Sequence, residues 1–152
     1  MNLRTVFGRV SYVLSYPLLL LILRGSTRAY VLLLLNDKIL LTQSTLDYAS
    51  RWHLVGGGIK KGETIARGAV REVKEELGID IDESKLVSLG NGMLRAKNNY
   101  DYGLFFYPLD EEPKLKLRKS EITNAKFFTI QEIPKIQTSD TVQKALQLLA
   151  LK

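Results

Sequence analysis

Unbroken hydrophobic runs in the middle of the chain predict β-strands. Residues Ala29 to Leu35 read AYVLLLL, a run typical of a strand that is buried on both faces. Asn36 and Asp37 suit a turn, and Lys38 to Thr42 then predicts the returning strand of a hairpin. Three more stretches of apolar and β-prone residues, bounded by turn residues, predict strands at 86–95, 102–109 and 125–130.

Apolar residues at intervals of three and four predict two amphipathic helices. The first runs from Thr64 to Leu77, and its apolar stripe consists of Ile65, Ala69, Val73 and Leu77. Gly78 follows it in the position of a left-handed C-cap. The second occupies Thr141 to Leu151, with Asp140 available as its N-cap. One face of each helix is therefore expected to pack inward.

The first 28 residues have a pattern of their own. Val10 to Leu23 contains no charged residue, but its 14 residues are fewer than the ~20 that span a bilayer as a helix. Pro17 suits the first turn of a helix and Gly25 its end, so we expect two short helices here. We expect residues 1–28 to be an apolar, basic extension that packs on the core, forms a homodimer or contacts a membrane surface. Residues 29–152 are expected to form one domain.

Length and composition are those of a globular chain, with 152 residues of which 45% are hydrophobic and 25% charged. The absence of cysteine excludes disulfides and thiolate chemistry, so any metal must bind to oxygen atoms or to the single histidine, His53. The net charge is +6, and four arginines without any acidic residue lie in the first 28 residues. This balance favours an anionic membrane surface or partner at least as much as nucleic acid. No convincing signal-peptide cleavage site is present, and we expect a cytoplasmic protein that can associate with membranes. A second basic cluster is expected on a solvated strand or hairpin and comprises Lys114, Lys116, Arg118 and Lys119.

Three glutamates on the first amphipathic helix are candidates for chemistry. Glu72, Glu75 and Glu76 stand at i, i+3 and i+4, which places them on one small patch of its surface. Like charges at this spacing destabilise a helix by about a few tenths of a kcal/mol per pair. A bound Mg²⁺ would reverse the sign of this interaction, because Mg²⁺ prefers oxygen ligands and gathers carboxylates with substrate phosphates. Taken alone, the pattern is explained at least as well by a solvated charged face.

The segment that contains these glutamates, WHLVGGGIKKGETIARGAVREVKEELGI from Trp52 to Ile79, resembles the Nudix family closely. The family's box is a glycine, five residues, a glutamate, seven residues and then Arg-Glu-aliphatic-x-Glu-Glu-x-Gly-aliphatic. Every defined position is met, at Gly57, Glu63, Arg71, Glu72, Val73, Glu75, Glu76, Gly78 and Ile79. The hairpin before the box and residues 120–134 after it extend the resemblance over most of residues 29–151. It implies the Nudix fold, an α/β architecture with a mixed β-sheet sandwiched between helices (α/β/α).

The resemblance also implies roles for individual residues. In such enzymes the glutamates of the helix hold divalent cations, Mg²⁺ or Mn²⁺, often with a backbone carbonyl from the glycine before the box. The expected ligands here are Gly56, Glu72, Glu75 and Glu76. Glu63 and Arg71 are expected to brace the loop against the helix, although Arg71 could instead contact phosphate. Glu121 lies where many relatives place a late glutamate that binds metal or activates water.

Two positions depart from the family's usual residues, with Val55 in place of a common proline and Gly68 in place of alanine. Neither change removes a ligand. Gly68 inside a helix costs about 1 kcal/mol relative to alanine, so we expect either a close approach of a loop or ligand there or a packing reason. His53 is expected to be an ordinary strand residue that faces a neighbour or solvent.

The implied reaction is metal-assisted hydrolysis of a nucleoside diphosphate linked to another moiety. The candidate proton acceptors are Glu72, Glu76 and Glu121, and the sequence does not select among them. Nucleoside triphosphates are the default expectation for the substrate. An RNA 5′-end pyrophosphohydrolase and a non-catalytic nucleotide-binding domain stay open as alternatives.

Specificity depends on loops outside the box, where candidate substrate-binding residues are Arg51, Tyr100 and Tyr102. With Asn98 and Asn99, the two tyrosines could instead form an exposed polar turn between strands. The proline that marks many ADP-ribose hydrolases after the box is missing, which weighs against that substrate. The isomerases that share the fold rely on a cysteine, and this chain has none.

Overall fold

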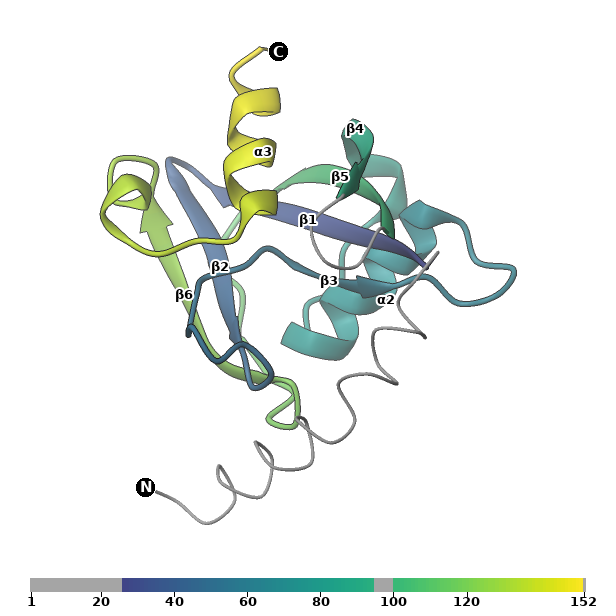
Figure 1. Ribbon diagram of the computed structural model, residues 1–152, viewed down its shortest axis with the longest axis horizontal. Helices are drawn as coiled ribbons and strands as arrows, with labels where there is room; N and C mark the ends of the chain where they lie inside the picture. The colour runs from purple at the N-terminus through teal and green to yellow at the C-terminus, as the bar shows by residue number, and fades with distance from the viewer. Residues whose placement is uncertain (1–25, 95–99, 152) are drawn as a thin grey trace.

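The computed structural model describes residues 26–94 and 100–151, which form a six-stranded mixed sheet with a helix on each face (Figure 1). The strands are β1 (Thr27–Leu35), β2 (Lys38–Ser44), β3 (Val55–Gly58), β4 (Val87–Leu94), β5 (Tyr100–Pro108) and β6 (Ile122–Thr129). The helices are α2 (Ile65–Leu77) and α3 (Asp140–Leu149), with short 3-10 turns at Glu83–Lys85 and Ile133–Lys135. The expected α/β fold, a mixed sheet between helices, is confirmed.

The sheet separates two hydrophobic clusters because successive residues of β1 point to opposite faces. Val31 and Leu33 pack in the cluster that contains α2, whereas Leu32 packs in the cluster that contains α3. None of the three side chains has exposed surface. Burial on both faces explains why β1 is an unbroken hydrophobic run and not an alternating one. Figure 1 shows α2 and α3 on opposite sides of this central strand.

The short strand β3 lies at the edge of the sheet, beside the first half of β1. β1 pairs in parallel with β5 along one edge and antiparallel with β2 and β3 along the other. The register places Ala29 opposite Gly57 and Val31 opposite Val55. Because β3 ends in three glycines, α2 can lie close to its backbone. This close approach is what positions the candidate site.

Both ends of α2 are capped, and the C-cap, Gly78, is the residue that the sequence predicts, whereas Thr64 is the N-cap and not the first helical residue. The Thr64 hydroxyl accepts a hydrogen bond of 3.1 Å from the backbone N–H of Arg67, as expected of an N-cap. Gly78 ends the helix in the left-handed conformation, with φ 72°. At α3 the prediction was wrong by one position, because Ser139 is the N-cap and Asp140 is the first helical residue.

Two other features differ from the sequence-based expectation. β1 begins at Thr27, inside the segment expected to be an N-terminal extension. The helices predicted in that extension lie outside the described residues, so the dimer or membrane contact expected of it stays a prediction. Asn98 and Asn99 also lie outside the described residues. The basic cluster at 114–119 was expected to lie on a strand or hairpin, but no strand includes these residues. Their backbone instead hydrogen-bonds to the last turn of α2, where the N–H of Arg118 donates to the Glu76 carbonyl over 2.9 Å.

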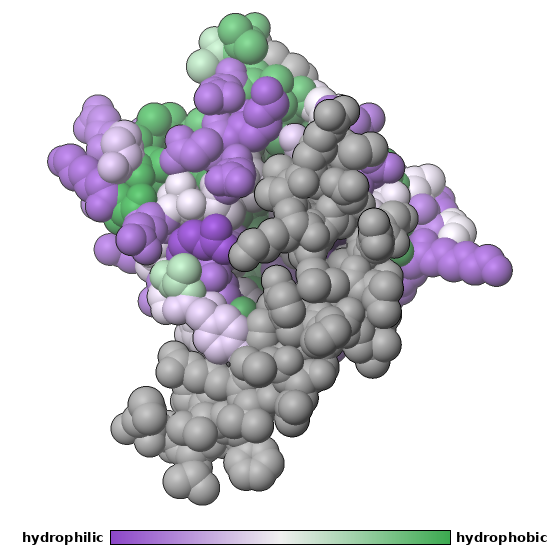
Figure 2. Space-filling model, viewed as in Figure 1, coloured by the Kyte–Doolittle hydropathy of each residue, from purple (hydrophilic) through white to green (hydrophobic). Residues whose placement is uncertain are grey.

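Hydrophilic side chains cover much of the described surface in the view of Figure 2, including the visible side of α3. The large hydrophobic side chains that are exposed lie at separate positions, namely Leu46, Tyr48, Val87, Ile130 and Leu151. None of the helices in the described part of the chain has the length and hydropathy needed to cross a membrane.

Candidate functional site

The C-terminal half of α2 places two glutamates against the backbone of β3. Glu72 and Glu76 are each 8% exposed. A Cβ atom on Gly57 would lie 2.6 Å from the carboxyl carbon of Glu72, so any other residue there would displace this side chain from the position in which Arg71 holds it. Gly56 has φ 151°, and its N–H donates a hydrogen bond of 3.3 Å to Glu76 Oε2. Two consecutive glycines therefore form the surface on which both carboxylates lie.

Glu76 is held in an environment that disfavours its charged form. Burial raises the pKa of Glu76 to about 8, and the neighbouring negative charge of Glu72 adds to this effect. The charge of Glu121 acts in the same direction. A cation among these carboxylates would favour ionised Glu76.

Arg71 connects the loop before α2 to the buried glutamates. Its Nε and Nη2 atoms donate hydrogen bonds of 2.9 Å to the two carboxylate oxygens of Glu63, and Nη1 donates one of 2.6 Å to Glu72 Oε1. Nη2 also donates to the carbonyl oxygen of Gly58 over 2.8 Å. Hydrogen bonding to Arg71 lowers the pKa of Glu63 to about 2. The structure thus contains the predicted Glu63–Arg71 pair, and this pair also fixes the direction of Glu72.

Gly68 has a packing reason that the sequence left open. A Cβ atom at this position would overlap the side chain of Ile59 and lie 3.2 Å from Glu63 Oε2. Both neighbours belong to the loop that Arg71 holds. The absence of a Cβ methyl group at Gly68 therefore lets the loop lie directly on α2. The hydrogen bonds of Arg71 to Glu63, Glu72 and Gly58, together called the Arg71 clamp, hold it there.

Glu75 points toward positive charges. Lys60 Nζ lies 3.1 Å from its Oε1 atom, and Arg118 Nη1 lies 3.3 Å from its Oε2 atom. Arg71 Nη1 is 3.5 Å from the same Oε2. The hydrogen bond from Lys60, with the nearby charges of both arginines, lowers the pKa of Glu75. Glu75 is therefore the predicted metal ligand with the most positively charged surroundings.

The donor atoms fit a divalent cation in their chemistry, although the side chains are not gathered around one point. Among the residues described, no three histidine, aspartate or glutamate side chains form a group that could hold a metal ion as they stand. Glu72 and Glu76 nevertheless present two buried carboxylates that repel each other, and a hard cation with a preference for oxygen would stabilise them. Glu75 would join them by leaving Lys60 and Arg118.

Glu121 comes from the turn that precedes β6. Its side chain is 42% exposed, and Arg118 Nη1 lies 3.4 Å from its Oε1 atom. The Glu121 carbonyl accepts a hydrogen bond of 2.8 Å from the backbone N–H of Thr45, which ties this turn to the end of β2. The structure thus places Glu121 on the side of the molecule that carries Glu75 and Glu76.

Arg51 and His53 are both held by Asp47. Arg51 Nε lies 3.0 Å and His53 Nε2 lies 2.6 Å from Asp47 Oδ2. Burial lowers the pKa of His53, and the hydrogen bond with Asp47 opposes that effect. Asp47 also accepts a hydrogen bond from the N–H of Ala49, so one side chain of the β2–β3 loop contacts three other residues of the same segment. Substrate binding by Arg51 stays a prediction, and His53 faces a carboxylate neighbour in agreement with its expected ordinary role.

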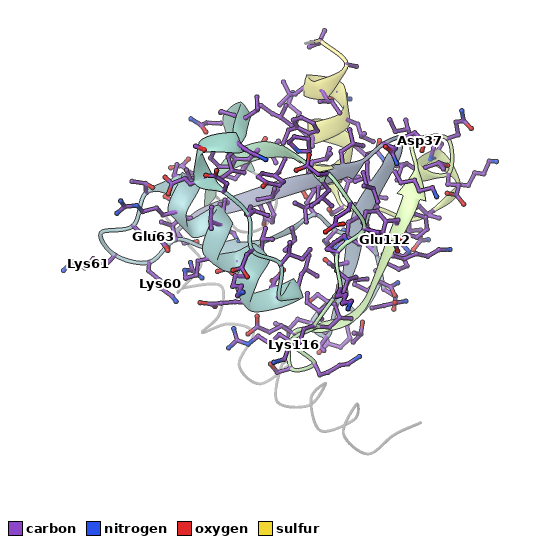
Figure 3. The ribbon with its side chains drawn as sticks, turned by 180° about the vertical axis from the view of Figure 1, so that it is seen from behind. Asp37, Lys60, Lys61, Glu63, Glu112 and Lys116 are labelled. Atoms are coloured by element: carbon purple, nitrogen blue, oxygen red, sulfur yellow. The ribbon has the colours of Figure 1, made fainter. Side chains whose placement is uncertain are left out.

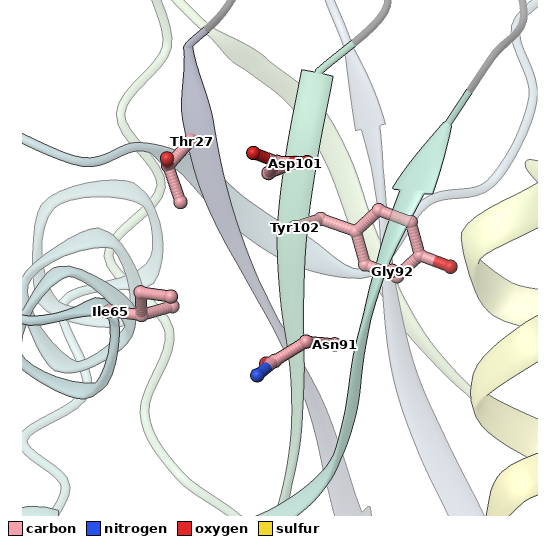
Figure 4. Close-up of a pocket in the computed structure, with 6 residues that line it drawn as sticks. All are labelled: Thr27, Ile65, Asn91, Gly92, Asp101 and Tyr102. Atoms are coloured by element: carbon pink, nitrogen blue, oxygen red, sulfur yellow. The ribbon is translucent and has the colours of Figure 1, made fainter.

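A pocket of about 410 Å³ lies at the ends of three adjacent strands beside the start of α2 (Figure 4). It is lined by Thr27, Ile65, Asn91, Gly92, Asp101 and Tyr102. Tyr102 is only 7% exposed, and a Cβ atom on Gly92 would lie 2.5 Å from its hydroxyl oxygen. Tyr102 is therefore mainly a core residue, so stacking on a base through its ring face would require rearrangement. The backbone of Tyr100 lies in β5, and its expected role stays a prediction.

Three residues that contact predicted site residues were not singled out from the sequence, since Lys60 and Arg118 contact Glu75, and Asp47 contacts Arg51. Lys60 and Arg118 meet Glu75 across 15 and 43 positions of the chain, so no local spacing rule connects them. The only sequence signals were that Lys60 lies inside the glycine-rich loop and that Arg118 belongs to a basic cluster.

Comparison with known proteins agrees with this architecture. The sequence model of the NUDIX domain matches residues 25–149. The chain is 29% identical over 117 residues to an NAD-capped RNA hydrolase, NudC, from Vibrio vulnificus (strain CMCP6), across 73% of this chain and 41% of that protein. It thus spans less than half the length of that relative.

Two solved structures show the same fold. A MutT NUDIX hydrolase from Burkholderia pseudomallei superposes with a TM-score of 0.71 at 17% identity, over 82% of this chain and 98% of that one. A bifunctional NMN adenylyltransferase/ADP ribose pyrophosphatase from Francisella tularensis, complexed with AMP and a Mn ion, gives a TM-score of 0.70 at 23% identity. That match covers 92% of this chain and 46% of the other.

Proposed function

Because this chain belongs to the NUDIX family of hydrolases, we propose that it hydrolyses the diphosphate linkage of a nucleoside diphosphate joined to another moiety. The observation that carries the proposal is the pair of buried carboxylates, Glu72 and Glu76, on the glycine backbone of β3. Two adjacent buried acids destabilise a fold unless a counter-charge is supplied. A site for divalent cations and phosphate accounts for an arrangement that packing alone would disfavour.

The residues proposed to hold Mg²⁺ or Mn²⁺ are the Gly56 carbonyl, Glu72, Glu75 and Glu76. When bound, such a cation would offset charge on the phosphate oxygens and lower the pKa of water. Arg71 orients Glu72 through the 2.6 Å hydrogen bond and so acts on the site from behind the carboxylate. The Francisella tularensis protein, which this chain matches over 46% of its length, was solved as a complex with AMP and a Mn ion, so Mn²⁺ is tested beside Mg²⁺.

Glu121 is our proposal for the group that takes the proton from the attacking water. Glu72 is engaged by Arg71, and Glu76 is buried against Gly56. Glu121 is the most exposed of the three candidate bases, and Arg118, which contacts its carboxylate, also contacts Glu75. A carboxylate with this access can approach a water molecule without leaving a buried hydrogen bond.

The substrate class is a nucleotide, with nucleoside triphosphates as the first choice. A specific observation favours a second candidate, hydrolysis at the 5′ end of RNA, because a relative 29% identical to this chain is named an NAD-capped RNA hydrolase. Homodimer formation or membrane contact by residues 1–28, and a cytoplasmic location, stay predictions that do not affect this choice.

The test is turnover of purified protein on nucleoside triphosphates, ADP-ribose, NADH, and triphosphorylated and NAD-capped RNA, with Mg²⁺ and with Mn²⁺. Glu75→Gln should lower kcat/KM by about 10- to 100-fold or more, because it removes a metal ligand. Glu121→Gln should lower kcat by about 100-fold while Mn²⁺ affinity is retained. Glu112→Gln is the matched control, since Glu112 is exposed and lies elsewhere on the surface (Figure 3).

Absence of turnover on the whole panel, with no difference between wild type and Glu75→Gln in Mn²⁺ binding, would contradict the proposed function. The RNA candidate predicts greater activity on RNA ends than on free nucleotides, with a steep decrease as salt is raised. Equal or greater activity on free nucleoside triphosphates would reject that candidate.

A further inference from the structure

Two exposed cationic side chains hold opposite oxygen atoms of one predicted metal ligand. Lys60 Nζ contacts Glu75 Oε1 over 3.1 Å, and Arg118 Nη1 contacts Glu75 Oε2 over 3.3 Å. The side chains of Lys60 and Arg118 are 63% and 46% exposed, whereas that of Arg71 is 18% exposed. The three positively charged side chains around Glu75 therefore differ in exposure, since Lys60 and Arg118 approach it from the solvent and Arg71 is mostly buried.

The backbone of Lys60 and that of Arg118 are both held by hydrogen bonds, so the Cα positions of the two side chains are fixed. The N–H of Lys60 donates a hydrogen bond of 2.9 Å to Glu63 Oε2, within the loop that Arg71 holds on α2. The N–H of Arg118 donates to the Glu76 carbonyl over 2.9 Å. Long side chains on anchored backbone can change partners without any change of fold. Lys60 and Arg118 thus approach the same carboxylate from two separate segments of the chain.

We propose that Lys60 and Arg118 bind the phosphate groups of the substrate, and that they neutralise Glu75 only until a metal ion replaces them. This inference rests on the proposed function, because it assumes that Glu75 coordinates a divalent cation. A cation held by Glu75 would place a like charge beside both side chains and so would weaken their pairing with that carboxylate. The phosphate groups of a substrate bound there would then be the nearest negative charges to Lys60 and Arg118. Arg118 can donate two parallel hydrogen bonds to a phosphate, and Lys60 supplies a compact point charge.

Arg71 provides the internal contrast. It makes hydrogen bonds with both oxygens of Glu63, with Glu72 and with a backbone carbonyl, so its guanidinium is already occupied. Moving it toward phosphate would leave partly buried carboxylates without their partner. Of the two roles considered for Arg71, its contacts support holding the loop against α2. Contact with phosphate is proposed for Lys60 and Arg118 instead.

The test uses Lys60→Met and Arg118→Met in the full chain, with Lys61→Met and Lys119→Met as matched controls. Figure 3 shows Lys61 next to Lys60 at the outer end of the same loop. Lys119 follows Arg118 and is likewise exposed. Two affinities are measured by calorimetry, that of the metal-free protein for Mn²⁺ and that of the protein in saturating Mg²⁺ for inorganic pyrophosphate.

The proposal predicts changes of opposite sign. Lys60→Met and Arg118→Met should each tighten Mn²⁺ binding by about two- to fivefold, because each removes a positively charged side chain that competes with Mn²⁺ for Glu75. The same substitution should weaken pyrophosphate binding by about tenfold. Arg118→Lys, which keeps the charge, should restore the Mn²⁺ affinity of wild type and part of the pyrophosphate affinity. Both control variants should match wild type in both measurements.

A loss of Mn²⁺ affinity in Lys60→Met and Arg118→Met, or unchanged pyrophosphate binding, would overturn the proposal, since a purely structural role predicts one of these results. If wild type binds Mn²⁺ and turns over nucleotides while the variants match it, this inference alone fails. If wild type binds no Mn²⁺ and has no turnover, the proposed function fails and this inference fails with it.

Discussion

The clamp formed by Arg71 can be tested independently of catalysis, through the stability of the metal-free protein. Arg71→Met removes hydrogen bonds to Glu63, Glu72 and the Gly58 carbonyl in one step. Glu63→Gln keeps the size of its side chain but removes its charge. The two changes together form a double-mutant cycle that isolates the pairing from other effects.

The expected magnitude follows from how far the pair is removed from water. The side chains of Arg71 and Glu63 are 18% and 15% exposed, so the pair lies between a surface ion pair and a buried one. Exposed pairs contribute up to about 1 kcal/mol, and breaking a buried pair costs about 3–5 kcal/mol. We therefore expect Arg71→Met to lower the free energy of unfolding by about 2–3 kcal/mol. The coupling energy between the two positions should be about 1–2 kcal/mol.

The pH dependence of stability supplies a second measurement on the same pair. The pKa of Glu63 is about 2 in the folded protein, below the ordinary value of 4.5 for this side chain. The folded state therefore favours the ionised carboxylate, and this stabilisation is complete above pH ~4.5 and is lost as the pH falls toward ~2. In Glu63→Gln this part of the acid dependence should be missing.

Urea denaturation in EDTA, followed by circular dichroism at several pH values, measures both quantities. Arg67→Met is the matched control on the same helix, because Arg67 is 70% exposed and its contact with Glu83 is 3.8 Å long. It should change the free energy of unfolding by less than about 0.5 kcal/mol. A coupling energy below about 0.5 kcal/mol, or equal acid dependence in wild type and Glu63→Gln, would show that the pair does not stabilise the fold.

Two other substitutions follow from the same geometry. Glu76 has a folded pKa of about 8, above the ordinary value of 4.5, so metal-free wild type should lose stability as the pH rises through this interval. Glu76→Gln should lack that loss, and parallel melting curves of both proteins from about pH 5 to about pH 9 would contradict it. Gly68→Ala gains about 1 kcal/mol of helix propensity, but its Cβ overlaps Ile59 at a typical cost of about 1–3 kcal/mol. We expect a lower or unchanged free energy of unfolding in urea, and a gain near ~1 kcal/mol would show that the loop yields freely.

The sequence predicted most of the fold because its local signals agree with one another. The limits of α2 follow from Thr64 and Gly78, whose capping chemistry depends only on neighbouring backbone atoms. The buried run of β1 and the turn at Asn36 and Asp37 likewise need no distant partner to be recognised. At α3 the predicted N-cap, Asp140, lies one residue too late, because serine and aspartate suit an N-cap about equally and Ser139 takes that position in the fold.

Local sequence also specifies which side chains form the chemical face of α2, because helical spacing fixes Glu72, Glu75 and Glu76 on one patch. The differences among those three carboxylates arise only from tertiary packing. Glu72 and Glu76 are buried on the backbone of β3, whereas Glu75 is turned toward cations from two other segments. Spacing along a helix sets direction, but burial and charge at a carboxylate depend on which distant segments pack around it.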